Sequence, residues 1–324
     1  AAVGAYVDKG QFTAAFDRAL AAMIAYPTER ERAHAKLDAA ERERRLLVED
    51  ELNQGRTTLV ATDLAKLSAD ERAFIGKMQD VAAAVDALYA VQSGLPALAA
   101  KVPADDVASR SLFRRNWGTR CEGPRTERNP KCAAVPGGPI RLVDLYPAEL
   151  QKDAKFCEPL EKHPDSKALL APFVVVRSEG GKLVPVGYHL AYTAQMKRTS
   201  DTLIAAAAPL PESEAPLKKY LAAAAEAFKT NDWLAADEAW AAMNARNSKW
   251  FVRVGPDETY WEPCAQKAGF HMTFALINRD SLAWQDKLTP LQQEMENAIG
   301  TLVGKAYAPR KVSLPPGGRV RSRR

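Results

Sequence analysis

Five residues, Trp-Phe-Val-Arg-Val at positions 250–254, alternate in the period-2 pattern that predicts a short buried strand. Gly255 and Pro256 end this strand, because proline has no N–H to give to a ladder and glycine frees the backbone. The chain is therefore expected to contain at least one short strand whose end is fixed at Pro256.

Glu258 and Tyr260 follow the strand and are two residues apart. In an extended segment, this spacing points both side chains to the same side. A carboxylate beside a phenol can hold an amine and can also donate a hydrogen bond to a developing negative oxygen. The alternative is a capped strand end with a surface glutamate and a half-buried tyrosine, since surface acids are usually only solvated. The chemistry of the two residues leaves both interpretations open.

Helical periodicity dominates the rest of the chain. Ser68 and Glu71 form a capping-box sequence, and the apolar residues that follow recur every three or four positions. Residues 264–279 are also expected to form a helix, since Phe270 and Phe274 are four residues apart. The sequence predicts a mainly α fold, about 55–60% helical, with a small antiparallel β element.

That β element is expected from residues 172–186 and 249–256. The first range contains two β-branched runs around Ser-Glu-Gly-Gly at positions 178–181, which is a hairpin signal. Four regions follow from the changes of pattern along the chain. They are an N-terminal helical region (1–110), a loop-rich region with the β-hairpin (111–187), a helical region with the Gly-Pro-x-Glu-x-Tyr strand (188–311) and a disordered basic tail (312–324).

The net charge of +5 does not describe the body of the protein. Residues 305–324 hold seven basic residues and no acidic one, so residues 1–304 carry a slightly negative balance. This balance argues against a general nucleic-acid-binding surface. No run approaches the 18 uncharged apolar residues of a membrane-spanning helix, so no membrane span is expected.

The four cysteines are candidates for disulfide bonds. Cys121 and Cys132 bracket a polar loop that cannot form a core of its own, which suits a disulfide in an exported protein. Cys157 and Cys264 form a second candidate pair. The alternative is four ordinary thiols in a cytosolic protein. The disulfide interpretation favours a periplasmic or secreted location over the cytoplasm.

The segment Gly255-Pro256-Asp257-Glu258-Thr259-Tyr260 resembles the G-P-x-E-x-Y segment of the dipeptidyl-peptidase III family, zinc exopeptidases, and above all of its bacterial members. The similarity extends over residues 60–308. It includes the stretches 68–92, 172–177 and 229–243, and Lys267-Ala268 with Phe270, which were expected on a helix.

This resemblance implies the fold of the family's non-zinc lobe and a role for each of the two site residues. Glu258 would bind the free α-amino group of a peptide. Tyr260 would stabilise the oxyanion that forms when zinc-bound water attacks the second peptide bond. The resemblance fades near Lys311, before the family's zinc lobe, so a truncated chain is expected.

The family's zinc motif, H-E-x-x-G-H, is absent from the sequence. None of the four histidines is followed by glutamate, and no two lie within one helical turn of each other. The histidines are His34, His163, His189 and His271. No metal ligand is therefore assigned and no cofactor is expected in this chain, although zinc is implied for a full-length family member.

Three functional hypotheses remain, and whether the chain is an enzyme is open. The first is a non-zinc, substrate-binding lobe of a dipeptidyl-peptidase III-like metallo-exopeptidase, inactive alone. It would bind short peptides weakly and be completed by a missing C-terminal zinc lobe. The second is a non-catalytic helical binding or scaffold protein that keeps the fold. The third, a nucleic-acid or membrane-surface binder acting through the basic tail, fits the charge distribution least.

Overall fold

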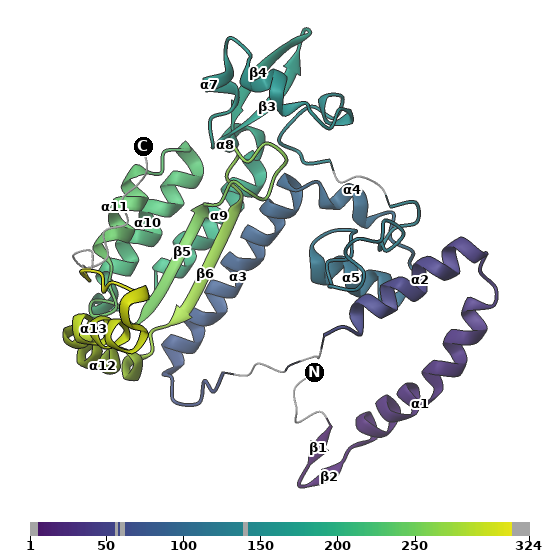
Figure 1. Cartoon of the computed structure of the whole chain (residues 1–324), viewed down its shortest axis with the longest axis horizontal. Coiled ribbons are helices and arrows are strands. Elements are labelled where there is room, and N and C mark those ends of the chain that lie inside the picture. The colour runs from purple at the N-terminus through teal and green to yellow at the C-terminus, as the bar shows by residue number, and fades with distance from the viewer. Residues whose placement is uncertain (1–5, 56–57, 59–61, 139–141, 313–324) are drawn as a thin grey trace. The chain divides into compact units, whose positions relative to one another are not determined.

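The computed structural model describes residues 6–55, 58, 62–138 and 142–312. Helices hold 54% of these residues, and the strands form three two-stranded antiparallel sheets (Figure 1). The predicted mainly α fold with small antiparallel β elements is confirmed. Among the described residues, no helix is both long enough and apolar enough to cross a membrane.

The contacts divide the chain into two compact units, each built from two stretches of sequence. The first comprises the described parts of residues 1–60 and 95–141, and the second those of 61–94 and 142–324. The predicted boundaries at 110 and 187 stay predictions. The predicted basic tail, except for Val312, lies outside the described residues.

The first unit is a set of helices with one short hairpin. Its elements are β1 (Val7–Asp8), β2 (Gln11–Phe12), α1 (Ala14–His34), α2 (Ala39–Leu52), α4 (Leu95–Ala99) and α5 (Val107–Asn116). The buried core is small and includes both cysteines of one predicted pair. It consists of Val48, Leu112, Cys121, Cys132 and Ala134.

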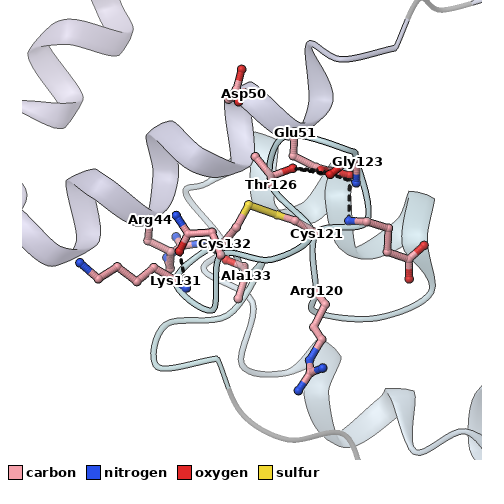
Figure 2. The surroundings of a disulfide bond; sticks show 12 residues. Arg44, Asp50, Glu51, Arg120, Cys121, Gly123, Thr126, Lys131, Cys132 and Ala133 are labelled. Carbon is pink, nitrogen blue, oxygen red and sulfur yellow. Dashed lines mark hydrogen bonds between the residues drawn. A yellow bond between two sulfur atoms is a disulfide. The ribbon is translucent and has the colours of Figure 1, made fainter.

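The predicted disulfide between Cys121 and Cys132 is formed in this unit. The Sγ atoms are 1.98 Å apart and the Cα atoms 5.6 Å apart. Glu51, at the end of α2, reaches into the same loop and accepts hydrogen bonds from the backbone N–H groups of Glu122 and Gly123 at 3.2 and 2.8 Å (Figure 2). The disulfide and the carboxylate together fix a loop that has little apolar surface to bury.

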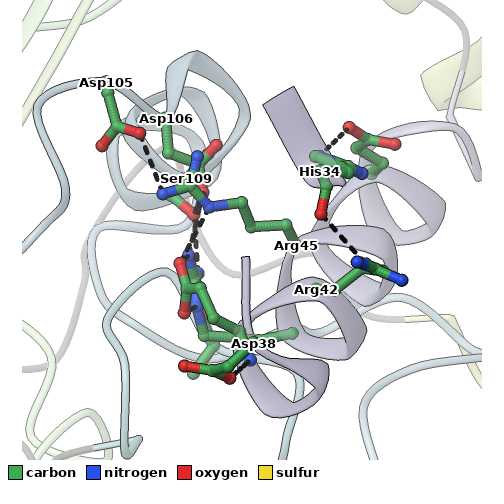
Figure 3. A network of polar contacts seen from close by, with 11 residues as sticks. His34, Asp38, Arg42, Arg45, Asp105, Asp106 and Ser109 are labelled. Atoms are coloured by element: carbon green, nitrogen blue, oxygen red, sulfur yellow. Dashed lines mark hydrogen bonds and ion pairs between the residues drawn. The ribbon is translucent and has the colours of Figure 1, made fainter. Parts of the chain in front are cut away.

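Buried and partly exposed ion pairs supply further contacts between α2 and the start of α5. Arg44 and Arg45 both contact Glu41 on their own helix. Arg44 also pairs with Asp106, the N-cap residue of α5, at 2.9 Å, and Arg45 pairs with Asp105 at 3.0 Å (Figure 3). The charge run that the sequence shows over α2 is therefore partly an interior network.

The second unit holds most of the helices and both longer hairpins. Its helices are α3 (Ala69–Gln92), α6 (Cys157–Glu161), α7 (Ser166–Leu169), α8 (Tyr188–Ala191), α9 (Thr193–Ala207), α10 (Ala215–Thr230), α11 (Leu234–Ala242), α12 (Arg279–Leu288) and α13 (Gln292–Val303). Its 3-10 turns are η2 (Leu150–Lys152), η3 (Glu212–Glu214), η4 (Thr289–Leu291) and η5 (Gly304–Ala306). Its strands are β3 (Val174–Glu179), β4 (Lys182–Gly187), β5 (Trp250–Pro256) and β6 (Phe270–Leu276).

Helix α3 forms as its sequence predicts and supports β5 and β6. Ser68 and Glu71 make the complete capping box. The apolar face of the helix is buried, and Phe74 lies 5.3 Å from the ring of Trp250 and 5.9 Å from that of Phe274. Figure 1 shows α3 running beside the β5–β6 hairpin. This packing holds the predicted strand in place.

The predicted helix over residues 264–279 is wrong. Residues 260–269 form turns, and Phe270–Leu276 is strand β6, paired antiparallel with β5 from Trp250↔Leu276 to Pro256↔Phe270. The spacing of Phe270 and Phe274 fits both a helix and a strand, and it is the pairing with β5 that decides. The β element also differs from the prediction, because β3–β4 and β5–β6 are separate sheets.

Candidate functional site

Glu258 and Tyr260 lie in the segment of residues 257–269 that joins β5 to β6. Both side chains are exposed, and Tyr260 is 76% accessible rather than half-buried. Within the described part of the chain, neither has a hydrogen-bond or ion-pair partner. A carboxylate and a phenol are thus presented to solvent two residues apart, and their orientation to one side stays a prediction.

The backbone of Glu258 is fixed by the hairpin that precedes it. Its carbonyl accepts a hydrogen bond from the N–H of Gly269 at 2.9 Å, and Asp257 N–H donates to the carbonyl of Gly269 at 3.0 Å. These bonds continue the β5–β6 ladder beyond Pro256. Glu258 therefore stands two residues beyond the last strand pair, Pro256↔Phe270, and Tyr260 follows in the turn.

Glu262 organises this turn from inside. Its carboxylate, 4% exposed, accepts hydrogen bonds from the backbone N–H groups of Cys264, Gln266 and Lys267 at 2.8, 2.5 and 2.9 Å. Tyr146 adds a fourth through its hydroxyl at 3.2 Å. The turn wraps around a buried negative charge, which satisfies backbone donors that have no regular secondary structure.

Lys267 ties the same turn to a neighbouring segment. Its side chain is fully buried, and its ammonium donates hydrogen bonds to the backbone carbonyls of Leu169 and, at 2.9 Å, Ala171. Burial lowers the pKa of Lys267 to about 8, although the nearby negative charge of Glu262 acts in the opposite direction. The ammonium also lies 6.0 Å from the centroid of the Tyr146 ring. Burying a cation is costly, so these contacts mark a position where the segment is firmly held.

Helices α3 and α8 contribute two more anchors, which the sequence did not reveal. Gln92, fully buried, donates to the carbonyl of Ala268 at 3.0 Å and accepts from the N–H of Phe270 at 3.1 Å. The hydroxyl of Tyr188 also donates to Ala268, at 3.0 Å. The side-chain type alone carries no signal for such contacts, because they depend on which elements meet in space.

The second predicted disulfide, between Cys157 and Cys264, is also formed. The Sγ atoms are 2.00 Å apart and the Cα atoms 5.4 Å apart. The bond joins the first residue of α6 to the turn that follows Tyr260.

Asp257, the acidic residue directly before Glu258, already has basic partners. Asp257 pairs with Arg253 at 2.8 Å and lies 3.7 Å from Nδ1 of His271. Arg253 in turn lies over the ring of Trp240, 5.0 Å from its centroid. At this end of the hairpin, the carboxylate of Glu258 is therefore the one open to a cationic ligand.

The residues of this chain do not fit a zinc ion. Among the described residues, no three His, Cys, Asp or Glu side chains come together in a way that could hold a metal. The remaining residues of the sequence include none of these four types. Tetrahedral zinc sites need three or four such ligands, so no step involving a metal is assigned to this chain.

Two solved structures share the fold. Dipeptidyl-peptidase III (DPP III) from Caldithrix abyssi matches with a TM-score of 0.64 and 24% identity, over 77% of this chain and 47% of that one. The enzyme from Corallococcus sp. strain EGB matches with a TM-score of 0.63 and 23% identity, over 81% and 48%. No family model and no curated protein matches the sequence. The chain has a DPP III-like fold and spans about half the length of these two structures.

Proposed function

We propose that this chain is the peptide-binding lobe of a dipeptidyl-peptidase III-like exopeptidase. Glu258 binds the free α-amino group of a short peptide, and Tyr260 donates a hydrogen bond to a nearby carbonyl oxygen. The observation that carries the proposal is a pair of exposed side chains just after β5 that have no polar partner among the described residues, on a segment held by buried contacts in a DPP III-like fold.

The chemistry of this pair sets the affinity. A charge-assisted hydrogen bond contributes about 1.5–3 kcal/mol, and a neutral one about 1 kcal/mol. Binding must first offset the loss of translational and rotational freedom, which costs several kcal/mol. Two exposed groups therefore hold a peptide weakly, and dissociation constants of about a millimolar or weaker are expected.

Hydrolysis requires groups that this chain does not bring together. A metallo-exopeptidase needs an activated water, and the donor set for the metal is absent from the described residues. We propose that a separate zinc-bearing lobe supplies it, and that these 324 residues alone bind peptides without cleaving them.

The test is a ligand-observed NMR titration with trialanine and its N-acetylated form. Trialanine should bind about tenfold or more tightly than the acetylated peptide, because acetylation removes the charge that Glu258 recognises. Glu258→Gln should remove this preference. The matched control is Glu238→Gln, an exposed carboxylate on α11, which should leave it intact. Equal binding of both peptides, or a preference that survives in Glu258→Gln, would contradict the proposal.

A further inference from the structure

The disulfide between Cys157 and Cys264 joins two segments that have little regular structure. Cys264 lies four residues after Tyr260, inside the turn that Glu262 organises. Cys157 begins α6, a helix of five residues. Neither segment is held by a long helix or a strand at the point where the bond is made, so the covalent link has a large effect on their freedom.

Apart from the backbone bonds that join Asp257 and Glu258 to Gly269, the other anchors of the 257–269 segment lie at its end next to β6. Lys267 donates to the carbonyls of Leu169 and Ala171, and Ala268 N–H donates to the carbonyl of Pro172 at 2.9 Å. Gln92 also holds residues at this end of the segment. These contacts fix the return of the chain into β6 rather than the part that carries Tyr260.

Residues 260–264, the part of the segment that carries Tyr260, are joined to other elements mainly through side chains. Their contacts include the disulfide at Cys264, the hydrogen bond from the hydroxyl of Tyr146 to Glu262 at 3.2 Å, the hydrogen bond from Nε1 of Trp261 to the carbonyl of Lys267 at 3.0 Å, and the ring of Trp261, which lies 5.1 Å from that of Tyr89. The disulfide is the covalent link among them. Its loss would leave this part held by noncovalent contacts alone.

Glu262 couples the disulfide to the shape of the turn. One oxygen of its carboxylate accepts from the N–H of Cys264 at 2.8 Å, while the other accepts from Gln266 and Lys267. Cys264 is 7% exposed and belongs to the main apolar core of the unit. A movement of Cys264 would therefore break a charge-assisted hydrogen bond and open the turn on which Tyr260 stands.

We propose that the Cys157–Cys264 disulfide positions Tyr260 relative to Glu258 for ligand binding and makes the peptide affinity of this chain redox-dependent. This inference rests on the proposed function. A dithiol reductant converts the bond to two thiols and is itself oxidised to a disulfide, so two electrons and two protons pass to the cysteines. The released turn then samples many arrangements, and a peptide must order it again on binding.

The first measurement is the trialanine titration of the oxidised and the reduced chain, with thiols counted in each state. Reduction should raise the dissociation constant about tenfold, the cost of ordering Tyr260 and the turn that carries it again. Cys157→Ser/Cys264→Ser should bind as weakly as the reduced chain and should not respond to reductant. The matched control, Cys121→Ser/Cys132→Ser, lacks the disulfide of the first unit and should respond as the wild type does.

A second measurement separates this inference from the proposed function. Hydrogen exchange of the amides of residues 258–265 needs no ligand, and it should become at least about tenfold faster on reduction while exchange in α10 stays unchanged. Faster exchange without any peptide binding would show that the Cys157–Cys264 disulfide holds the turn in place and that the proposed function is wrong. If exchange and affinity both stay constant while four thiols are titrated in the reduced chain, the inference is overturned.

Discussion

The ring of Trp233 lies against the backbone of Gly255, where a Cβ would come within 2.8 Å of the ring carbon Cζ3. Gly255 also has a φ of 149°, a conformation that side chains disfavour. This close approach occurs near the end of strand β5, three residues before Glu258. Trp233, the N-cap residue of α11, thus meets strand β5 at a position that only glycine fits, and the path of the chain toward the site depends on it.

Gly255→Ala should lower the free energy of unfolding by about 2–4 kcal/mol, because it combines backbone strain with a clash against a buried indole. The measurement is urea unfolding followed by tryptophan fluorescence. Gly76→Ala is the matched control, since Gly76 lies in α3 with no neighbour within 4 Å of its Cβ position. That variant should be neutral or more stable by about 0.5–1 kcal/mol. Equal stability of the two variants would contradict the prediction.

Lys267 should make the second unit more stable as the pH rises from about 8 to about 9.5. Its folded-state pKa, about 8, lies below its ordinary value of 10.5, so the unfolded chain holds this proton where the folded chain has lost it. The state that binds more protons is disfavoured as the pH increases, so the free energy of unfolding grows by about 1.5 kcal/mol over this window.

Lys267→Met removes the titrating group and should show a flatter pH profile than the wild type over the same window. Urea unfolding at several pH values gives both profiles. The control is Lys218→Met, an exposed lysine on α10, whose profile should follow that of the wild type. Parallel profiles for Lys267→Met and the wild type would mean that the buried ammonium does not release its proton in this range.

Glu51 should make the first unit sensitive to acid. Burial raises the pKa of Glu51, but hydrogen bonds from the hydroxyl of Thr126 and the N–H groups of Gly123 and Glu122 outweigh burial and hold the pKa below its ordinary value. This stabilisation is present above the unfolded-state pKa of about 4.3 and is lost as the pH falls through the folded-state pKa.

Glu51→Gln tests this prediction, because an amide places a donor against the donors that the carboxylate accepts from. The variant should lose about 2–3 kcal/mol near neutral pH and show a weaker decline of stability in acid. Asp50→Asn is the control, since Asp50 is an exposed neighbour that pairs with Arg125 on the surface. A steep acid transition that persists in Glu51→Gln would assign the acid sensitivity to other groups.

The sequence predicts the elements whose signals are local. The capping box at Ser68 and Glu71, the β3–β4 hairpin and the strand over residues 250–256 all form as predicted. The Cys121–Cys132 pair is predicted because the polar loop between the two cysteines needs a link that its composition cannot supply, and Cys157 with Cys264 is the second predicted pair; both bonds form.

The predictions fail where structure depends on partners distant in the sequence. The residues 270–276 form a strand because β5 offers a ladder on one side and α3 an apolar face on the other. Periodicity over seven residues cannot reveal either. Similarly, Glu262 and Lys267 look like ordinary surface residues of a turn, and only the approach of Tyr146, Leu169 and Ala171 makes their burial possible.

The last prediction concerns the disulfide of the first unit. Cys121 and Cys132 are 11 residues apart, and closing a loop of this size is worth about 3 kcal/mol. The unit has a small apolar core, so it cannot readily replace this contribution. Cys121→Ser/Cys132→Ser should therefore increase hydrogen exchange in α2 and α5 by about a hundredfold, the factor that 3 kcal/mol corresponds to. Exchange in α10, which belongs to the second unit, should stay at the wild-type rate. A uniform increase in all three helices would show instead that the two units unfold as one.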